Sequence, residues 1–110
     1  MTTRIYIDAD ACPVKDEIYR VAARFNLPVS VVAGTWLRVP QDPMIECIAA
    51  GSGMDAADDW IAERATKGDV VITADIPLAS RCVKAGASVI APNGNPFTEE
   101  SIGMTLAVRN

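Results

Sequence analysis

Histidine is absent from the 110-residue sequence, which excludes the Ser-His-Asp and Cys-His arrangements of nucleophilic catalysis. Cysteine is scarce. Cys12, Cys47 and Cys82 are odd in number and widely spaced, so we expect neither a disulfide framework nor a zinc site. These thiols are predicted to be reduced and mostly buried, Cys12 included. Acid–base chemistry in this chain therefore falls to carboxylates, lysines and hydroxyls.

Long apolar runs are also missing from the sequence. No stretch approaches the length of about 20 apolar residues that spans a bilayer, and the N-terminus has no basic segment followed by an apolar one. We therefore expect neither membrane insertion nor secretion, and we predict a cytoplasmic protein. With 50% hydrophobic residues, the chain is predicted to form a single domain over residues 1–110.

Positive charge is in deficit, because ten basic residues stand against 14 acidic ones and give a net charge of −4. A negative domain repels a phosphate backbone unless cations intervene or basic residues gather on one face. The charge balance therefore disfavours simple electrostatic binding of nucleic acid. It does not disfavour a phosphate that is held through a metal ion.

Apolar periodicity predicts strands that alternate with helices along the whole chain. Apolar runs indicate strands at residues 4–8, 29–33, 70–73 and 88–91, and a strand is favoured over a helical turn at 44–50. Helical spacing indicates helices near 14–25, 55–66 and 77–84, and from residue 98 onwards. Parallel neighbours need crossover helices, so this order predicts an α/β fold with a doubly wound, central parallel sheet flanked by helices.

Apolar positions in the first two helices mark the faces that we expect to be buried. They are Val14, Ile18, Val21, Ala22 and Phe25 in the first, and Ala57, Trp60, Ile61 and Ala65 in the second. Between the second and third strands, residues 35–43 are predicted to form a loop. In this loop Trp36 and Leu37 are candidate anchors to the core.

Carboxylates follow two predicted strands at their carboxyl ends, where open α/β sheets hold their ligands. Asp8 and Asp10 follow the first apolar run, and Asp75 follows the run at 70–73. A lone buried carboxylate at Asp8 would be costly without a partner, so acids from two strands indicate a shared cation. Asp10 has an alternative role in opening the next loop, and Asp75 has one as a helix N-cap.

The densest acidic cluster consists of Asp55, Asp58 and Asp59. Capping and the helix dipole explain two of these residues, but three carboxylates within five residues repel one another unless a cation or a proton intervenes. Positions 55 and 58 or 59 share a helix face, so two of them could point toward Asp8. Lys15 is the basic residue expected near this site, where it would contact a substrate phosphate.

Three sequence blocks carry a resemblance to a known family. They are residues 8–15 (DADACPVK), 55–61 (DAADDWI) and 68–79 (GDVVITADIPLA). These blocks resemble the signature of the uncharacterised YaiI/YqxD family, which is similar to the PIN-like (PIN/NYN) nuclease superfamily. In those nucleases, acidic residues at strand ends and on one helix hold Mg²⁺ or Mn²⁺ for phosphodiester cleavage.

The resemblance implies metal ligands at Asp8, Asp10, Asp55, Asp58, Asp59 and Asp75. Among these aspartates, it implies catalytic roles for Asp8, Asp58 and Asp75, whereas Asp10 and Asp59 are secondary candidates. The family's usual chain continues into a segment with a Gly-Gly-Pro motif and basic residues. This chain is therefore expected to lack that C-terminal extension and, with it, part of the surface that grips nucleic acid.

We predict from these observations a nuclease that depends on Mg²⁺ or Mn²⁺ and hydrolyses phosphodiesters, with RNA as the expected partner. Two alternatives stay open. A magnesium-dependent, haloacid-dehalogenase-like phosphatase would use Asp8 as nucleophile and Asp10 as acid/base, and would form a covalent aspartyl phosphate. A catalytically silent domain would only bind a metal or a nucleic acid.

Overall fold

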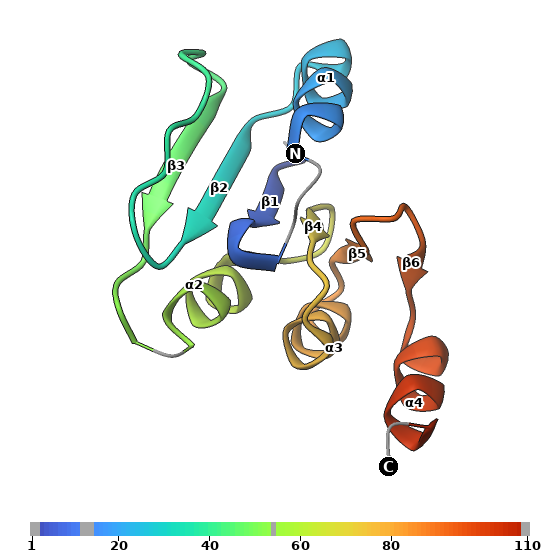
Figure 1. Cartoon of the computed structure of the whole chain (residues 1–110). Coiled ribbons are helices and arrows are strands. Elements are labelled where there is room, and N and C mark those ends of the chain that lie inside the picture. The colour runs from blue at the N-terminus through green and yellow to red at the C-terminus, as the bar shows by residue number, and fades with distance from the viewer. Residues whose placement is uncertain (1–2, 12–14, 54, 109–110) are drawn as a thin grey trace.

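A computed structural model of the chain describes residues 3–11, 15–53 and 55–108 (Figure 1). Its centre is a six-stranded sheet with the order β3-β2-β1-β4-β5-β6. The strands are β1 (Ile5–Asp8), β2 (Val29–Ala33), β3 (Ile45–Ala49), β4 (Val70–Ile72), β5 (Ser88–Ile90) and β6 (Pro96–Phe97). The helices are the 3-10 turn η1 (Ala9–Ala11), α1 (Lys15–Phe25), α2 (Ala56–Arg64), α3 (Ile76–Lys84) and α4 (Glu99–Val108).

The central strands form because their sequences are apolar on both sides of the backbone. β1 lies between β2 and β4 and is parallel to both, so that Ile7 stands opposite Val31 on one side and Ile72 on the other. β1 and β2 are buried along their whole lengths. Strands that are buried on both faces are the ones that carry continuous apolar runs.

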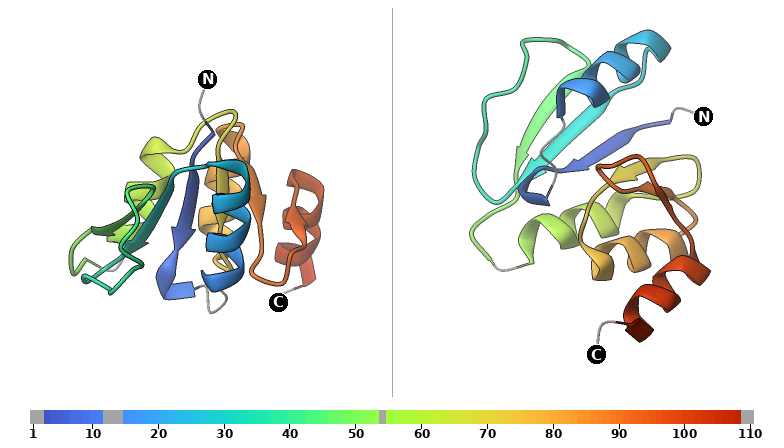
Figure 2. Two further views of the ribbon diagram at one scale, coloured as in Figure 1. Left: turned by 90° about the horizontal axis from the view of Figure 1, so that it is seen from above. Right: turned by 45° about the vertical axis from the view of Figure 1, so that its right-hand side comes forward.

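The chain winds outward from the middle of the sheet in two directions. From β1 it passes through α1 to β2 and β3, and then it returns to β4 on the other side of β1 and continues through α3 to β5. Figure 2 shows α1 on one face of the sheet and α2 and α3 on the opposite face. The fold is therefore a doubly wound α/β domain, as predicted, and the strand order reverses between β1 and β4.

Alternate residues of β1 build the two halves of the core. Ile5 and Ile7 pack on the face that α1 covers, where they join Ala22. Tyr6 packs on the opposite face, together with the α2 residue Ile61. The Tyr6 ring also meets the Trp60 ring edge to face, with 6.0 Å between their centroids. The buried face predicted for α2 is confirmed, since Ala57, Ile61 and Ala65 are buried and Trp60 is half-buried.

The sheet departs from the all-parallel prediction at its edge. β6 runs antiparallel to β5, with Phe97 opposite Val89 and Pro96 opposite Ile90. The sequence indicated only a turn here, because a two-residue strand is too short for apolar alternation to reveal it. A proline is tolerated at this position because an edge strand leaves backbone N–H groups without a ladder partner. The strand predicted at 44–50 is confirmed as β3.

Two predictions about buried side chains are wrong. Val21 and Phe25 of α1 are 51% and 63% exposed, because only one edge of that apolar stripe, with Ala22 fully buried, faces the sheet. Trp36 is 68% exposed and does not anchor the loop between β2 and β3, whereas Leu37 packs against the core. Val14 lies outside the described residues.

The described cysteines are free thiols, as expected. Cys82 is buried, and burial raises the pKa of its thiol to about 11, which keeps it protonated and unreactive at neutral pH. Cys47 is half-buried, and Cys12 lies outside the described residues. No helix among the residues that the structure describes is long and apolar enough to cross a membrane.

Candidate metal-binding cleft

A polar cleft opens at the carboxyl ends of β1 and β4, where the strand order reverses. In Figure 1, η1 and α2 lie beyond the arrowheads of β1 and β2. The cleft has a volume of about 260 Å³, and its walls are formed by Asp8, Asp10, Gly34, Gly53, Ala57, Asp58 and Asp75. Four carboxylates from separate segments thus surround one space, at the position where doubly wound sheets hold ligands.

Asp8 is the last residue of β1 and is only 3% exposed. Its Oδ2 accepts a hydrogen bond of 2.7 Å from the Thr73 hydroxyl. Burial raises the pKa of Asp8 above its ordinary value, and the neighbouring charges of Asp75 and Asp10 raise it further, although the hydrogen bond from Thr73 opposes them. The ionised form of Asp8 is therefore under strain that a positive ion would relieve.

Thr73 is a positioning residue that the sequence did not single out. It is fully buried, and besides donating to Asp8 its Oγ1 accepts a hydrogen bond of 2.9 Å from the Asp75 backbone N–H. One hydroxyl thus connects the acid of β1 to the acid that follows β4. A threonine two residues before an aspartate at a strand end is a local signal for such a turn and could have identified it.

Asp75 has two roles at once. It is the N-cap of α3, where its Oδ1 accepts a hydrogen bond of 2.9 Å from the Leu78 N–H, and Pro77 occupies the first turn. The expected capping role is therefore confirmed. The same side chain also lines the cleft, so the cap fixes the direction in which this carboxylate points.

The acidic cluster at the start of α2 separates into three environments. Asp58 lines the cleft, and burial, followed by the charges of Asp75 and Asp8, raises its pKa to about 6. Asp59 points elsewhere and accepts a hydrogen bond of 2.7 Å from Arg81 of α3. Asp55 is exposed at the N-cap position and makes no side-chain capping bond. Successive helix positions are about 100° apart, so neighbouring acids face different surroundings.

Asp10 reaches the cleft from η1, and its Oδ2 accepts a hydrogen bond of 3.3 Å from the Gly34 N–H. A side chain at position 34 would place its Cβ 3.2 Å from the Gly51 carbonyl oxygen, so glycine lets these backbones approach each other closely. The sequence identified Gly34 only as the end of a strand. Lys15 begins α1 and is not among the described residues that line the cleft.

The side chains of the cleft suit a hard divalent cation in their chemistry. Among the described residues, no three cysteine or carboxylate groups are arranged to hold one ion together. As arranged, the cleft can offer at most two carboxylates to a single ion. Mg²⁺ commonly takes one or two carboxylates and completes its octahedral shell with water and phosphate oxygens, so this donor set fits it.

Comparisons with known proteins give the chain clear relatives. A family model described as "Uncharacterized BCR, YaiI/YqxD family" matches residues 6–110. The UPF0178 protein bll3966 of Bradyrhizobium diazoefficiens is 83% identical over 108 residues, which are 98% of this chain and 65% of that protein. UPF0178 proteins of Rhodopseudomonas palustris (strain HaA2) and Nitrobacter winogradskyi are each 81% identical, over 98% and 97% of this chain and 66% and 68% of their own lengths.

The matched region is only part of each relative. This chain spans about two-thirds of the length of the curated relatives that it matches. No solved structure matches the chain. The names of these relatives state no activity, so the residues of the cleft are the only guide to its chemistry.

Proposed function

The chain belongs to the uncharacterised YaiI/YqxD family, and we propose that it is a hydrolase that cleaves phosphodiesters of nucleic acid with a divalent metal ion in its acidic cleft. One observation carries the proposal. Four aspartates from β1, η1, α2 and the start of α3 surround a single cleft, and the pKa values of Asp8 and Asp58 are raised there. Perturbed carboxylates that share a cleft are a signature of functional sites.

The proposed cofactor is Mg²⁺ or Mn²⁺, held by two of the four aspartates Asp8, Asp10, Asp58 and Asp75. When bound, such an ion stabilises the charge that develops on a phosphate and lowers the pKa of an attacking water. This chain contains no histidine that could act as the base, and a metal removes the need for one. The PIN-like relationship suggested by the sequence leads to the same class of reaction, by analogy of fold alone.

The residues of the chain supply positioning and electrostatics. The Thr73 hydroxyl fixes the Asp8 carboxylate, and the α3 cap fixes that of Asp75. Burial and the neighbouring acids raise the pKa of Asp58 to about 6, so a bound cation would stabilise its ionised form. Without a cation the acidic cleft repels phosphate, so binding of a phosphate in the cleft would depend on prior or simultaneous binding of the metal ion.

The phosphatase alternative receives less support from the cleft. Its nucleophile would be Asp8, but this carboxylate is buried and hydrogen-bonded to Thr73. It also requires a lysine close to the phosphate, and no lysine lines the cleft among the described residues. The silent-domain alternative is favoured by one specific observation, that no three described carboxylates converge on one point. Measurements of cleavage activity decide between the silent domain and the nuclease.

The cytoplasm remains the proposed compartment.

The first test is thermal unfolding of the wild type with increasing Mg²⁺ or Mn²⁺. Binding to the folded state alone raises the free energy of unfolding by about 2.7 kcal/mol at a metal concentration 100 times the dissociation constant. We expect Asp8→Asn to abolish most of this gain. The matched control is Glu63→Gln, because Glu63 is exposed near the carboxyl-terminal end of α2, whereas Asp58 near the other end of that helix lines the cleft.

The second test is cleavage of labelled single-stranded RNA under the same conditions. We expect cleavage by the wild type and by Glu63→Gln, and at least a hundred-fold slower cleavage by Asp8→Asn, which corresponds to about 2.7 kcal/mol. Metal-dependent stabilisation without any cleavage would support the silent-domain alternative. If neither metal stabilises the wild type, the proposal fails.

A further inference from the structure

The segment between β2 and β3 presents an alternating pattern of exposure. Trp36, Arg38 and Pro40 are exposed, whereas Leu37 and Val39 between them are half-buried. Among the described residues, Trp36 is the most exposed large hydrophobic side chain, at 68%. Alternation with a period of two is the pattern of an extended chain that turns one side toward a core and the other toward solvent.

Leu37 and Val39 fasten this segment to the protein. Both pack against the part of the core beneath α1, and the Leu37 N–H donates a hydrogen bond of 3.3 Å to the Cys47 Sγ of β3. The exposed indole of Trp36 is therefore held on an ordered support. Presenting an aromatic ring in this way costs little conformational entropy when a ligand binds.

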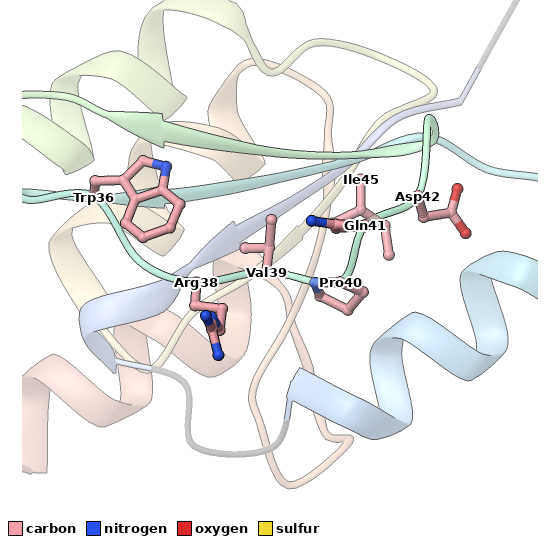
Figure 3. A pocket seen from close by; sticks show the side chains of 7 residues that line it. All are labelled: Trp36, Arg38, Val39, Pro40, Gln41, Asp42 and Ile45. Carbon is pink, nitrogen blue, oxygen red and sulfur yellow. The ribbon is translucent and has the colours of Figure 1, made fainter.

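A cavity of about 590 Å³ lies along the same segment. Figure 3 shows the Trp36 indole and the Arg38 guanidinium standing off the chain beside it. Within the described ranges, four arginines pair with carboxylates, namely Arg4, Arg20, Arg64 and Arg81. Arg38 forms no ion pair with any carboxylate in the described part of the chain, so its charge can serve an external anion.

The segment begins at the acidic cleft. Gly34 lines that cleft and donates its N–H to Asp10, and Trp36 follows two residues later. Two residues of extended chain span at most about 7 Å. A base stacked on Trp36 would therefore belong to a nucleotide close to the one whose phosphate enters the cleft.

We propose that Trp36 and Arg38 form a binding site for single-stranded nucleic acid, in which an unpaired base stacks on the indole and the guanidinium contacts the adjoining phosphate. Aromatic platforms combined with cationic side chains are how proteins hold single strands without reading their sequence. The inference deepens the proposed function, on which it rests, by naming unpaired nucleic acid as the substrate class.

The experiment uses Trp60→Phe as the parent, which leaves Trp36 as the single tryptophan. Oligouridylate or oligothymidylate is titrated in EDTA at low salt, and both tryptophan fluorescence and the anisotropy of the labelled oligonucleotide are recorded. We expect binding to quench Trp36 fluorescence, and Trp36→Ala to weaken binding by about 5- to 100-fold. A duplex of the same length should bind more weakly, since its bases are already stacked.

Two exposed residues of α1 provide matched controls. Phe25→Ala removes another exposed aromatic ring and should leave affinity unchanged. Arg38→Gln should lower the slope of log affinity against log salt concentration by about 0.7, whereas Arg24→Gln, with the same change of charge, should not. Thermal unfolding confirms that each variant folds.

The inference is overturned if the oligonucleotide does not bind, or if the fluorescence is unchanged at oligonucleotide concentrations that saturate the anisotropy. Equal affinities of Trp36→Ala and its parent would also overturn it. Because the titration contains no metal, its result is separate from that of the cleavage assay. Quenching without cleavage supports this site while the nuclease proposal fails. Cleavage by a protein that shows no quenching retains the nuclease and removes the site.

Discussion

Two aspartates are buried at opposite ends of the sheet, and their surroundings differ. Asp69 precedes β4 at its amino end and is 7% exposed, and it accepts hydrogen bonds from the backbone N–H groups of Arg4 (3.2 Å) and Thr66 (3.1 Å). Asp8 ends β1 at the carboxyl end and accepts one bond from the Thr73 hydroxyl, among further carboxylates. Asp69 is thus held by two fixed backbone donors, and it ties the residues before β1 and after α2 to the start of β4.

The difference shows how burial alone fails to identify a site. A carboxylate that receives backbone N–H groups on both oxygens is compensated within the fold. A carboxylate that is buried beside others of like charge is compensated only by protons or by a bound cation, and the raised pKa of Asp8 expresses this. We therefore interpret Asp69 as structural and Asp8 as functional.

The largest expected loss of stability comes from replacing Asp69, the structural aspartate. Asp69→Ala leaves the Arg4 and Thr66 N–H groups without their acceptor, and we expect the free energy of unfolding to fall by about 2–4 kcal/mol in urea denaturation. Asp42→Ala is the control, because it removes an exposed carboxylate that accepts the Met44 N–H and should cost less than about 1 kcal/mol. In the absence of metal, Asp8→Asn should cost less than Asp69→Ala, since it also relieves repulsion. The reverse order would contradict the distinction.

The second prediction concerns the hydroxyl that links the two acids of the cleft. Thr73→Val preserves the shape of a fully buried side chain but removes the donor to Asp8 and the acceptor of the Asp75 N–H. We expect a loss of about 1–3 kcal/mol in the free energy of unfolding and a further rise in the pKa of Asp8. Thr73→Ser keeps the hydroxyl and should retain the pKa of Asp8 and most metal-dependent stabilisation, while Thr73→Val should lose both. Equal metal responses in the two variants would assign Thr73 to packing alone.

Much of the fold could be predicted because its signals are local. The apolar runs at β1, β2 and β4 identify buried strands without knowledge of their neighbours, and acids directly after a strand necessarily lie at its carboxyl end. Asp8, Asp10 and Asp75 were placed at one edge of the sheet by this reasoning, and they do line one cleft. The antiparallel edge of β6 was missed because two residues carry no periodicity.

The remainder depends on contacts between distant segments. Asp59 is held away from the cleft by a hydrogen bond that Arg81, 22 residues later in the chain, donates to its carboxylate. No pattern within α2 predicts this contact. Whether α1 buries Val21 depends on how the whole helix packs on the sheet. The three adjacent acids of α2 therefore looked equivalent in the sequence, although Asp58 alone among them lines the cleft.

Asp58 gives the smallest predicted effect and the one that most sharply tests the electrostatic account of the cleft. The pKa of Asp58 is about 6 in the folded protein, whereas the ordinary value for an aspartate, which applies to the unfolded chain, is 3.8. Between these two pH values the folded state therefore binds more protons than the unfolded state. The stability that protonation contributes is complete below pH 4 and is lost as the pH rises through 6. An asparagine at position 58 does not titrate. Asp58→Asn should therefore match the wild type in free energy of unfolding at pH 4 and exceed it by about 1 kcal/mol at pH 7.5, a gain that is reduced by solvent screening of a partly exposed group.

The control for this prediction is Asp55→Asn, which removes an exposed neighbouring charge and should produce a smaller gain in the free energy of unfolding. In saturating Mg²⁺ we expect the wild type to be more stable than Asp58→Asn, because only the wild type keeps the carboxylate that would bind the ion. If Asp58→Asn is still the more stable protein in Mg²⁺, Asp58 is not a metal ligand.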